Sequence, residues 1–117
     1  MLAIRGAIFV DKDTPQEIEK RTNQLMNKIF SVNSIESEEV VAVIFSVTPD
    51  LRSMNPATVF RKSGRAFSSM CFQEADFSHS PKRVLRVMVL LERNRFGNVV
   101  HVYENGAESL KEWRWSD

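Results

Sequence analysis

The hydrophobic and polar positions of the chain divide it into short apolar runs and one long amphipathic segment. Apolar residues dominate three longer runs, at 2–10, 40–47 and 84–91. Runs of this length that are rich in β-branched residues are typical of buried strands. A shorter run at 66–72 and the alternating segment 98–103 predict two further strands. The pattern therefore predicts five strands.

The amphipathic segment between the first two apolar runs predicts the main helix. Thr14, Pro15 and Glu17 form a helix-start signal, with a capping hydroxyl, a proline suited to the first turn and a glutamate that completes a capping box. The residues of one helix face follow at helical spacing, and they are Ile18, Thr22, Leu25, Met26, Ile29 and Phe30. The sequence thus predicts a helix from Pro15 to about Val32.

Shorter segments predict the next connections. Asn55 can cap a second helix that begins at Pro56 and ends near Lys62, just before Gly64. Residues 34–39 are polar and acidic, and they predict a loop with one helical turn.

The order of these elements predicts an α/β protein with a mixed sheet and its main helix on one face. Ser80 and Pro81 predict a helical turn before the third long strand, and residues 93–97 predict a turn after it. No linker or repeat divides the chain, so we expect a single domain over residues 1–117. Beyond about residue 104 the pattern assigns no element.

The composition is that of an ordinary globular protein. Of the 117 residues, 43 % are hydrophobic and 26 % are charged, and the net charge of +1 argues against electrostatic binding of nucleic acid. Cys71 is the only cysteine, which excludes an internal disulfide and favours a reducing compartment. No secretion signal and no run long enough to cross a bilayer is present, so we expect a cytoplasmic protein without a membrane partner. A chain this small often gains stability by oligomerisation.

Two arginines stand alone in otherwise apolar runs, Arg5 in the run 2–10 and Arg86 in the run 84–91. Strand side chains alternate between faces, and both faces of the second run are apolar. We therefore expect that strand to be covered on both sides and Arg86 to be buried. A guanidinium stays charged in a protein, so a buried arginine needs an anionic partner. The two arginines predict either a site for a small anion, such as a dicarboxylate, or two internal salt bridges.

Other side chains bear on this choice. Glu74 and Tyr103 lie near strand ends and can face the same pocket, although Glu74 is equally a candidate counter-ion for either arginine. Neither His79 nor His101 has a cysteine or carboxylate at ligand spacing, and no glycine-rich phosphate loop is present. If the protein is an enzyme, we expect it to work without a metal, a nucleotide or a covalent intermediate.

A set of short motifs then occurs in order along most of the chain. They are Ile4-Arg5-Gly6-Ala7, Asp13-Thr14, Ser46-Val47-Thr48-Pro49-Asp50-Leu51, Cys71-Phe72-Gln73-Glu74, Arg86-Val87-Met88 and His101-Val102-Tyr103. With these motifs the sequence resembles the small monofunctional chorismate mutases of the AroH type. The resemblance implies a homotrimer with a pseudo-α/β-barrel core and active sites in clefts between neighbouring subunits. It also implies rearrangement of chorismate to prephenate, toward phenylalanine and tyrosine, with no cofactor.

The resemblance also implies roles for individual residues. Arg86 matches the arginine that contacts a substrate carboxylate and the ether oxygen of the breaking C–O bond, and Arg5 matches the arginine that binds the side-chain carboxylate. Glu74 matches the acceptor of a hydrogen bond from the ring hydroxyl. Tyr103 matches a tyrosine at the same end of the substrate, and Cys71 matches a residue of the ring pocket.

The rim of the implied site departs from the family pattern. Asn55 and Thr58 stand where the family has an aromatic residue and a lysine, whereas Arg61 and Leu110 match family residues. Lys111 takes the place of an arginine in the tail. Loss of a cation at the pocket mouth is expected to weaken substrate capture more than the chemical step.

Two other functions remain open on the residues alone. A non-catalytic trimer can use the same arginines to bind a small dicarboxylate. An imine deaminase of the Rid type has a similar trimeric fold and an arginine for its substrate's carboxylate. The Thr48-Pro49-Asp50 and Gln73-Glu74 segments fit chorismate mutase better than a deaminase.

Overall fold

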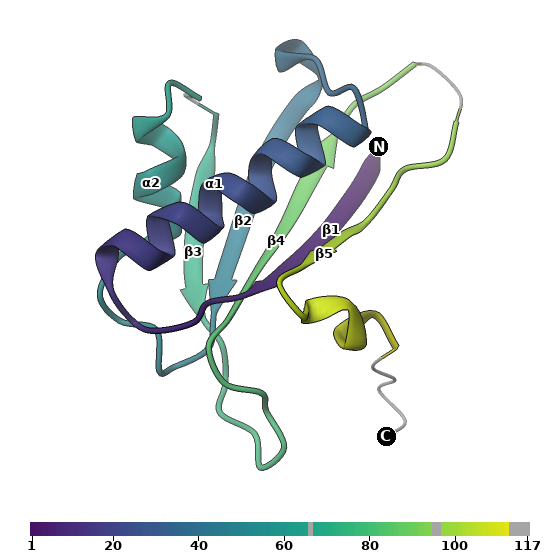
Figure 1. Ribbon diagram of the computed structural model, residues 1–117. Coiled ribbons are helices and arrows are strands. Elements are labelled where there is room, and N and C mark those ends of the chain that lie inside the picture. Colours follow the sequence, from purple (N-terminus) through teal and green to yellow (C-terminus); the bar gives the residue numbers. More distant parts are fainter. Residues whose placement is uncertain (66, 95–96, 113–117) are drawn as a thin grey trace.

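The computed structural model describes residues 1–65, 67–94 and 97–112, with side chains described as far as Leu110. The elements form one five-stranded mixed sheet with two α-helices (Figure 1). The strands are β1 (Leu2–Phe9), β2 (Val40–Val47), β3 (Ser69–Gln73), β4 (Val84–Leu91) and β5 (Val102–Glu104). The helices are α1 (Pro15–Val32) and α2 (Pro56–Lys62), with the 3₁₀ helices η1 (Ser37–Glu39) and η2 (Ala107–Glu112). This is the predicted fold class.

The sheet places β4 at its centre, in the order β3-β2-β4-β1-β5. β4 is antiparallel to both β1 and β2, while β3 runs parallel to β2 and β5 runs parallel to β1. The register sets Arg86 of β4 between Ala7 of β1 and Ser46 of β2. Tyr103 of β5 is opposite Ala7 on the other side. These four side chains therefore share one region of the sheet.

The main helix begins as predicted, because the Thr14 hydroxyl accepts a hydrogen bond from the Glu17 backbone N–H at 3.2 Å. Its apolar side is fully buried against the sheet, and the buried hydrophobic residues are Ile18, Leu25, Met26 and Ile29. Helix and sheet approach closely at Gly6, where an added Cβ would lie 2.8 Å from Cδ1 of Ile29. A larger residue there would force the Ile29 side chain to move, so glycine permits this close approach.

The second helix also begins as predicted. The Asn55 side chain accepts a hydrogen bond from the Ala57 backbone N–H at 2.8 Å. It lies on the same side of the sheet as α1 (Figure 1). Its buried aromatic residue, Phe60, packs edge-on to Phe45 of β2, with ring centroids 5.7 Å apart.

The face of the sheet away from α1 and α2 is open in the single chain. Met88 on this face is 38 % exposed, and the Arg86 side chain is 35 % exposed. Met70 and Phe72 of β3 are exposed by 54 % and 53 %. The prediction that β4 is covered on both sides is therefore wrong for the described chain, because both α-helices lie on one side. Arg5 is also exposed rather than buried.

Three boundaries differ from the sequence prediction. No helical turn forms at Ser80 and Pro81, where the chain bends toward Arg83. The Arg83 N–H donates to the Asp50 carboxylate at 2.9 Å and so takes no part in a helical hydrogen bond. The strand predicted at 66–72 is β3, which begins only at Ser69, and Ala66 itself lies outside the described residues.

The strand predicted at 98–103 is shortened to β5 by a side chain. The Asn33 amide accepts from the Val100 N–H at 2.7 Å and donates to the Val100 carbonyl at 2.9 Å. It thus occupies the backbone groups that a neighbouring strand would use. The single helical turn expected at 34–39 is confirmed as η1, whereas η2 forms where the sequence pattern assigned nothing. The predicted turn at 93–97 includes residues outside the described ones.

No helix among the described residues is long and apolar enough to cross a membrane.

Candidate active site

A cleft of about 460 Å³ lies on the open face of the sheet, against β1, β4 and η2. Its polar lining comes from Arg5, Ser46, Arg86 and Tyr103, and Leu110 of η2 contributes an apolar wall. These residues come from five separate elements of the fold. The cleft therefore brings together four of the predicted site residues and one, Ser46, that the sequence analysis did not single out.

Arg86 is paired with Glu74 at the edge of this cleft. The Arg86 Nε donates to Glu74 Oε2 at 3.0 Å, and the Ser46 hydroxyl donates to the same oxygen at 2.6 Å. Glu74 reaches this position because it directly follows β3, where its N–H donates to the Val47 carbonyl at 2.8 Å. Among the described residues, the two terminal nitrogens of Arg86 have no hydrogen-bond acceptor. They can therefore contact a bound anion.

The second arginine of the cleft has a different environment. Among the described side chains, no carboxylate forms an ion pair with Arg5. Its backbone N–H donates to Nδ1 of His101 at 2.9 Å. Burial, and next the charge of Arg5, hold the pKa of His101 below its usual value, which favours the neutral ring at pH 7. Since the Arg86–Glu74 pair is neutral overall, Arg5 makes this cleft net positive.

Tyr103 and Leu110 lie on either side of the turn that leaves β5. Ala107 of η2 is fully buried and packs with Ala7 and Val84 on the open face of the sheet. Leu110 follows Ala107 by three residues, which places both on one side of a 3₁₀ helix. Leu110 is thus turned toward the sheet and the cleft. The side chain of Lys111 lies outside the described residues, as do the last five residues of the chain.

The remaining predicted residues lie apart from this cleft. Asn55 and Cys71 line a second, shallower cleft of about 280 Å³ between β3 and the start of α2. Burial raises the pKa of the Cys71 thiol to about 11. On α2, the Arg61 guanidinium lies 3.5 Å from the Thr58 hydroxyl and 3.4 Å from the Ser69 hydroxyl. Within one chain the predicted site residues therefore form two separate groups.

Ser46 is the residue that sequence reasoning missed. It is the only polar side chain in the run 40–47, a signal of the same kind that singled out Arg86. A lone hydroxyl in an apolar strand is less costly to bury than a charge, so the pattern alone did not point to a partner. Its position opposite Arg86 became visible only with the strand register.

Metal binding has no support among the described residues, where no three His, Cys, Asp or Glu side chains are grouped so that they could hold an ion. The chemistry that the cleft offers is fixed positive charge, one carboxylate acceptor, a phenol and an apolar wall. Such a set can bind a small dianion that also carries a hydroxyl group.

Comparison with known proteins decides the family. The family model for chorismate mutase type I matches residues 1–113. The chain belongs to the type I chorismate mutase family. It is 38 % identical over 103 residues to the chorismate mutase AroH of Bacillus subtilis, covering 86 % of this chain and 81 % of that one. It is 40 % identical over 111 residues to the chorismate mutase AroH of Thermus thermophilus, covering 92 % and 91 %.

Solved structures agree. A chorismate mutase from Clostridium thermocellum superimposes with a TM-score of 0.88 at 33 % sequence identity, and the match covers 93 % of this chain and 99 % of that one. The single mixed sheet with its helices on one face is thus a type I chorismate mutase fold. The resemblance noted from the motifs is confirmed.

Proposed function

We propose that this chorismate mutase converts chorismate to prephenate in the cleft of Arg5, Arg86 and Glu74. The observation that carries the proposal is the placement of two arginines beside one carboxylate in a cleft of about 460 Å³. This volume falls in the range of roughly 300–1,000 Å³ that is usual for small-molecule sites. Chorismate has two carboxylates and a ring hydroxyl, which these three side chains match in charge and hydrogen bonding.

The reaction is an isomerisation that breaks one C–O bond and forms one C–C bond, with no proton transfer and no cofactor. Negative charge develops on the ether oxygen as the C–O bond breaks. The terminal nitrogens of Arg86 are proposed to bond to that oxygen and so to stabilise the transition state more than the substrate. Arg5 is proposed to bind the side-chain carboxylate, and Glu74 to accept from the ring hydroxyl. Tyr103 then helps to hold the compact reactive conformer and to exclude water, and Leu110 adds apolar contact to the bound substrate.

We further propose that the enzyme is a cytoplasmic homotrimer whose sites are completed by a neighbouring subunit. Two observations support this assembly. The open face of the sheet exposes apolar side chains such as Met88, Met70 and Phe72, which isolated monomers rarely leave uncovered together. In addition, a second group of site residues lies apart from the first cleft in one chain, around α2 and β3, and a neighbouring subunit can bring it to that cleft; this group consists of Asn55, Thr58, Arg61 and Cys71. A solution mass of three times the 13.5 kDa chain is the expected result of light scattering.

The function is tested by following the ultraviolet absorbance of chorismate with purified protein in the presence of a chelator. We expect rapid loss of absorbance and formation of prephenate in equal amount, with near-background loss for Arg86→Ala. Saturable binding of chorismate without turnover would instead favour the dicarboxylate binder. Release of ammonia from an imino acid, with chorismate untouched, would favour the deaminase.

A further inference from the structure

The wall of the cleft formed by η2 rests on a small apolar cluster. Among the described residues of η2 only Ala107 is fully buried; it packs with Ala7 and Val84, and Phe9, Tyr103 and Leu110 pack against this cluster. The chain reaches η2 through Asn105 and Gly106, both with positive φ, at +50° and +87°. Apolar packing is not directional, so it fixes the angle at which η2 leaves β5 less sharply than a hydrogen bond does.

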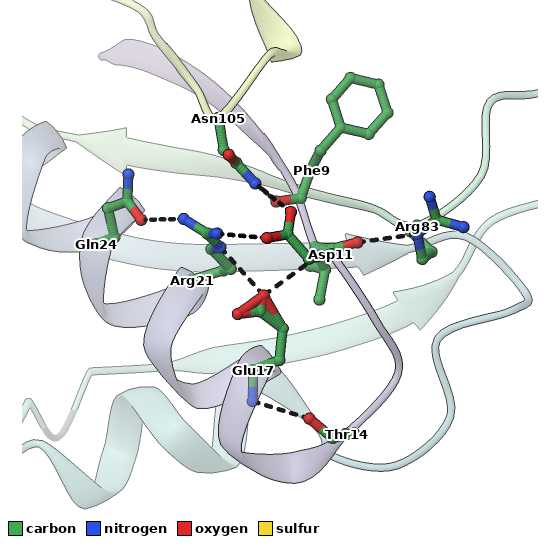
Figure 2. A network of polar contacts seen from close by, with 9 residues as sticks. Phe9, Asp11, Thr14, Glu17, Arg21, Gln24, Arg83 and Asn105 are labelled. Atoms are coloured by element: carbon green, nitrogen blue, oxygen red, sulfur yellow. Dashed lines mark hydrogen bonds and ion pairs between the residues drawn. The ribbon is translucent and has the colours of Figure 1, made fainter.

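A polar contact supplies the missing restraint. The Asn105 side-chain amide donates to the Phe9 carbonyl at 2.7 Å and to Asp11 Oδ1 at 3.0 Å, as Figure 2 shows. Both acceptors lie at the end of β1, more than 90 residues earlier in the sequence. The side chain thus joins the turn after β5 to the strand that carries Arg5.

Asp11 is itself held from the other side by α1 (Figure 2). Its Oδ2 lies 2.9 Å from Nη2 of Arg21, whose side chain is only 11 % exposed. The Arg21 Nε is 3.2 Å from the Glu17 carboxylate, which also accepts from the Asp11 N–H at 3.2 Å. The contact of Asn105 with Asp11 and Phe9, supported by Arg21, is called the Asn105 latch below.

The latch stays closed over the pH range in which an enzyme is assayed. The hydrogen bond from Asn105, together with the Arg21 charge, holds the pKa of Asp11 below its ordinary value. The carboxylate therefore remains ionised and a good acceptor well below neutral pH. Its role is one of position and not of proton transfer.

We propose that Asn105 is a positioning residue that fixes η2 and Leu110 over the cleft and so sets how tightly the substrate is held. This inference rests on the proposed function. Because the latch touches neither substrate nor the reacting atoms, its loss should act on capture and leave the chemical step nearly unchanged. KM is therefore expected to rise while kcat stays close to the wild-type value.

The sharpest variant is Asn105→Asp, which keeps the side-chain size and the tolerance of positive φ but replaces the donor by a carboxylate. That carboxylate would face the Phe9 carbonyl and Asp11. We expect KM to rise about tenfold with kcat within about twofold, the size of effect that one lost hydrogen bond permits. Asn105→Gly keeps the backbone angle and removes only the side chain, so it should raise KM in the same direction.

Two further variants separate positioning from general stability. The double variant Asp11→Asn with Asn105→Asp restores a donor–acceptor pair with its direction reversed, and KM should fall back part of the way. Glu39→Gln weakens the ion pair with Arg93, which lies 3.0 Å away beyond the opposite end of β4. It should lower the melting temperature while KM remains unchanged.

Hydrogen exchange gives a readout that does not depend on turnover. Because Asn105→Asp breaks the latch, we expect the amides of residues 106–112 to exchange faster in this variant than in the wild type, while the amides of α1 exchange at an unaltered rate. Unchanged exchange there overturns the inference, as does an active wild type whose KM is unaffected by Asn105→Asp. An inactive wild type would overturn the proposed function instead, and the exchange measurement would still decide whether the latch holds η2.

Discussion

Replacement of Arg86 by lysine tests how the cleft uses a guanidinium. The Arg86 Nε is bonded to Glu74 at 3.0 Å, which leaves both terminal nitrogens for substrate. Lysine offers one ammonium group, which cannot hold Glu74 and reach a carboxylate and an ether oxygen in one plane. Arg86→Lys therefore keeps the charge but loses the hydrogen-bonding geometry at the breaking bond.

The size of the loss follows from comparable sites. Removal of one positioned donor to a developing oxyanion costs about 2.7–4 kcal/mol, or roughly 10²–10³ in kcat. In the single chain the Arg86 side chain is 35 % exposed, and contact with solvent weakens its interactions with other charges. The full loss is expected if the protein assembles as the proposed trimer, in which a neighbouring subunit would cover the cleft.

The assay is steady-state turnover of chorismate by Arg86→Lys, with a check that its solution mass and melting temperature match the wild type. Arg61→Lys is the matched control, because it makes the same substitution on α2, away from the proposed ether-oxygen contact. We expect Arg61→Lys to change KM more than kcat. If Arg86→Lys keeps more than a tenth of the wild-type kcat, the argument from the rigid guanidinium is wrong.

Three further variants test other parts of the site. Ser46→Ala removes a 2.6 Å hydrogen bond to the Glu74 carboxylate. Bonds to charged groups contribute about 1.5–3 kcal/mol, so kcat/KM should fall about ten- to a hundredfold. A wild-type kcat/KM would mean that Ser46 does not contribute to the site. Thr58→Lys restores a cation at the rim and should lower KM several-fold in low salt, a gain that must shrink at high ionic strength if it is electrostatic. With a thiol pKa of about 11, Cys71 is ionised in about one molecule in a thousand at pH 8. Native protein should therefore react with iodoacetamide far more slowly than unfolded protein. Equal reaction rates would contradict the burial of the Cys71 thiol.

Local signals in the sequence were enough to predict most elements of the fold. The cap at Thr14 and the proline that follows it defined the start of α1, and Asn55 did the same for α2. The long strands followed from uninterrupted apolar runs. Arg86 could be singled out because a charge in such a run needs a partner, and the structure supplies that partner in Glu74. Arg86 thus forms an internal salt bridge with Glu74 through Nε, and its terminal nitrogens can still contact an anion, so the structure is compatible with both interpretations of this arginine.

Other features depended on contacts that are distant in the sequence. The open face of the sheet could not be predicted, because an apolar strand face covered by a helix and one covered by another subunit have the same pattern. The start of β5 is set by the Asn33 side chain, which takes the backbone groups of Val100. The role of Ser46 needed the β2–β4 register. The latch at Asn105 joins residues more than 90 positions apart, beyond any local pattern.

We propose that the rearrangement takes place in the cleft of Arg86 and Arg5. A crystal structure with a bicyclic dicarboxylate that mimics the transition state would show where the reacting atoms bind, because such analogues bind far more tightly than substrates. We expect the ether oxygen of the analogue about 3 Å from a terminal nitrogen of Arg86, its hydroxyl bonded to Glu74 and its ring against Leu110. An analogue bound elsewhere, or bound in this cleft with its ether oxygen turned away from Arg86, would contradict it.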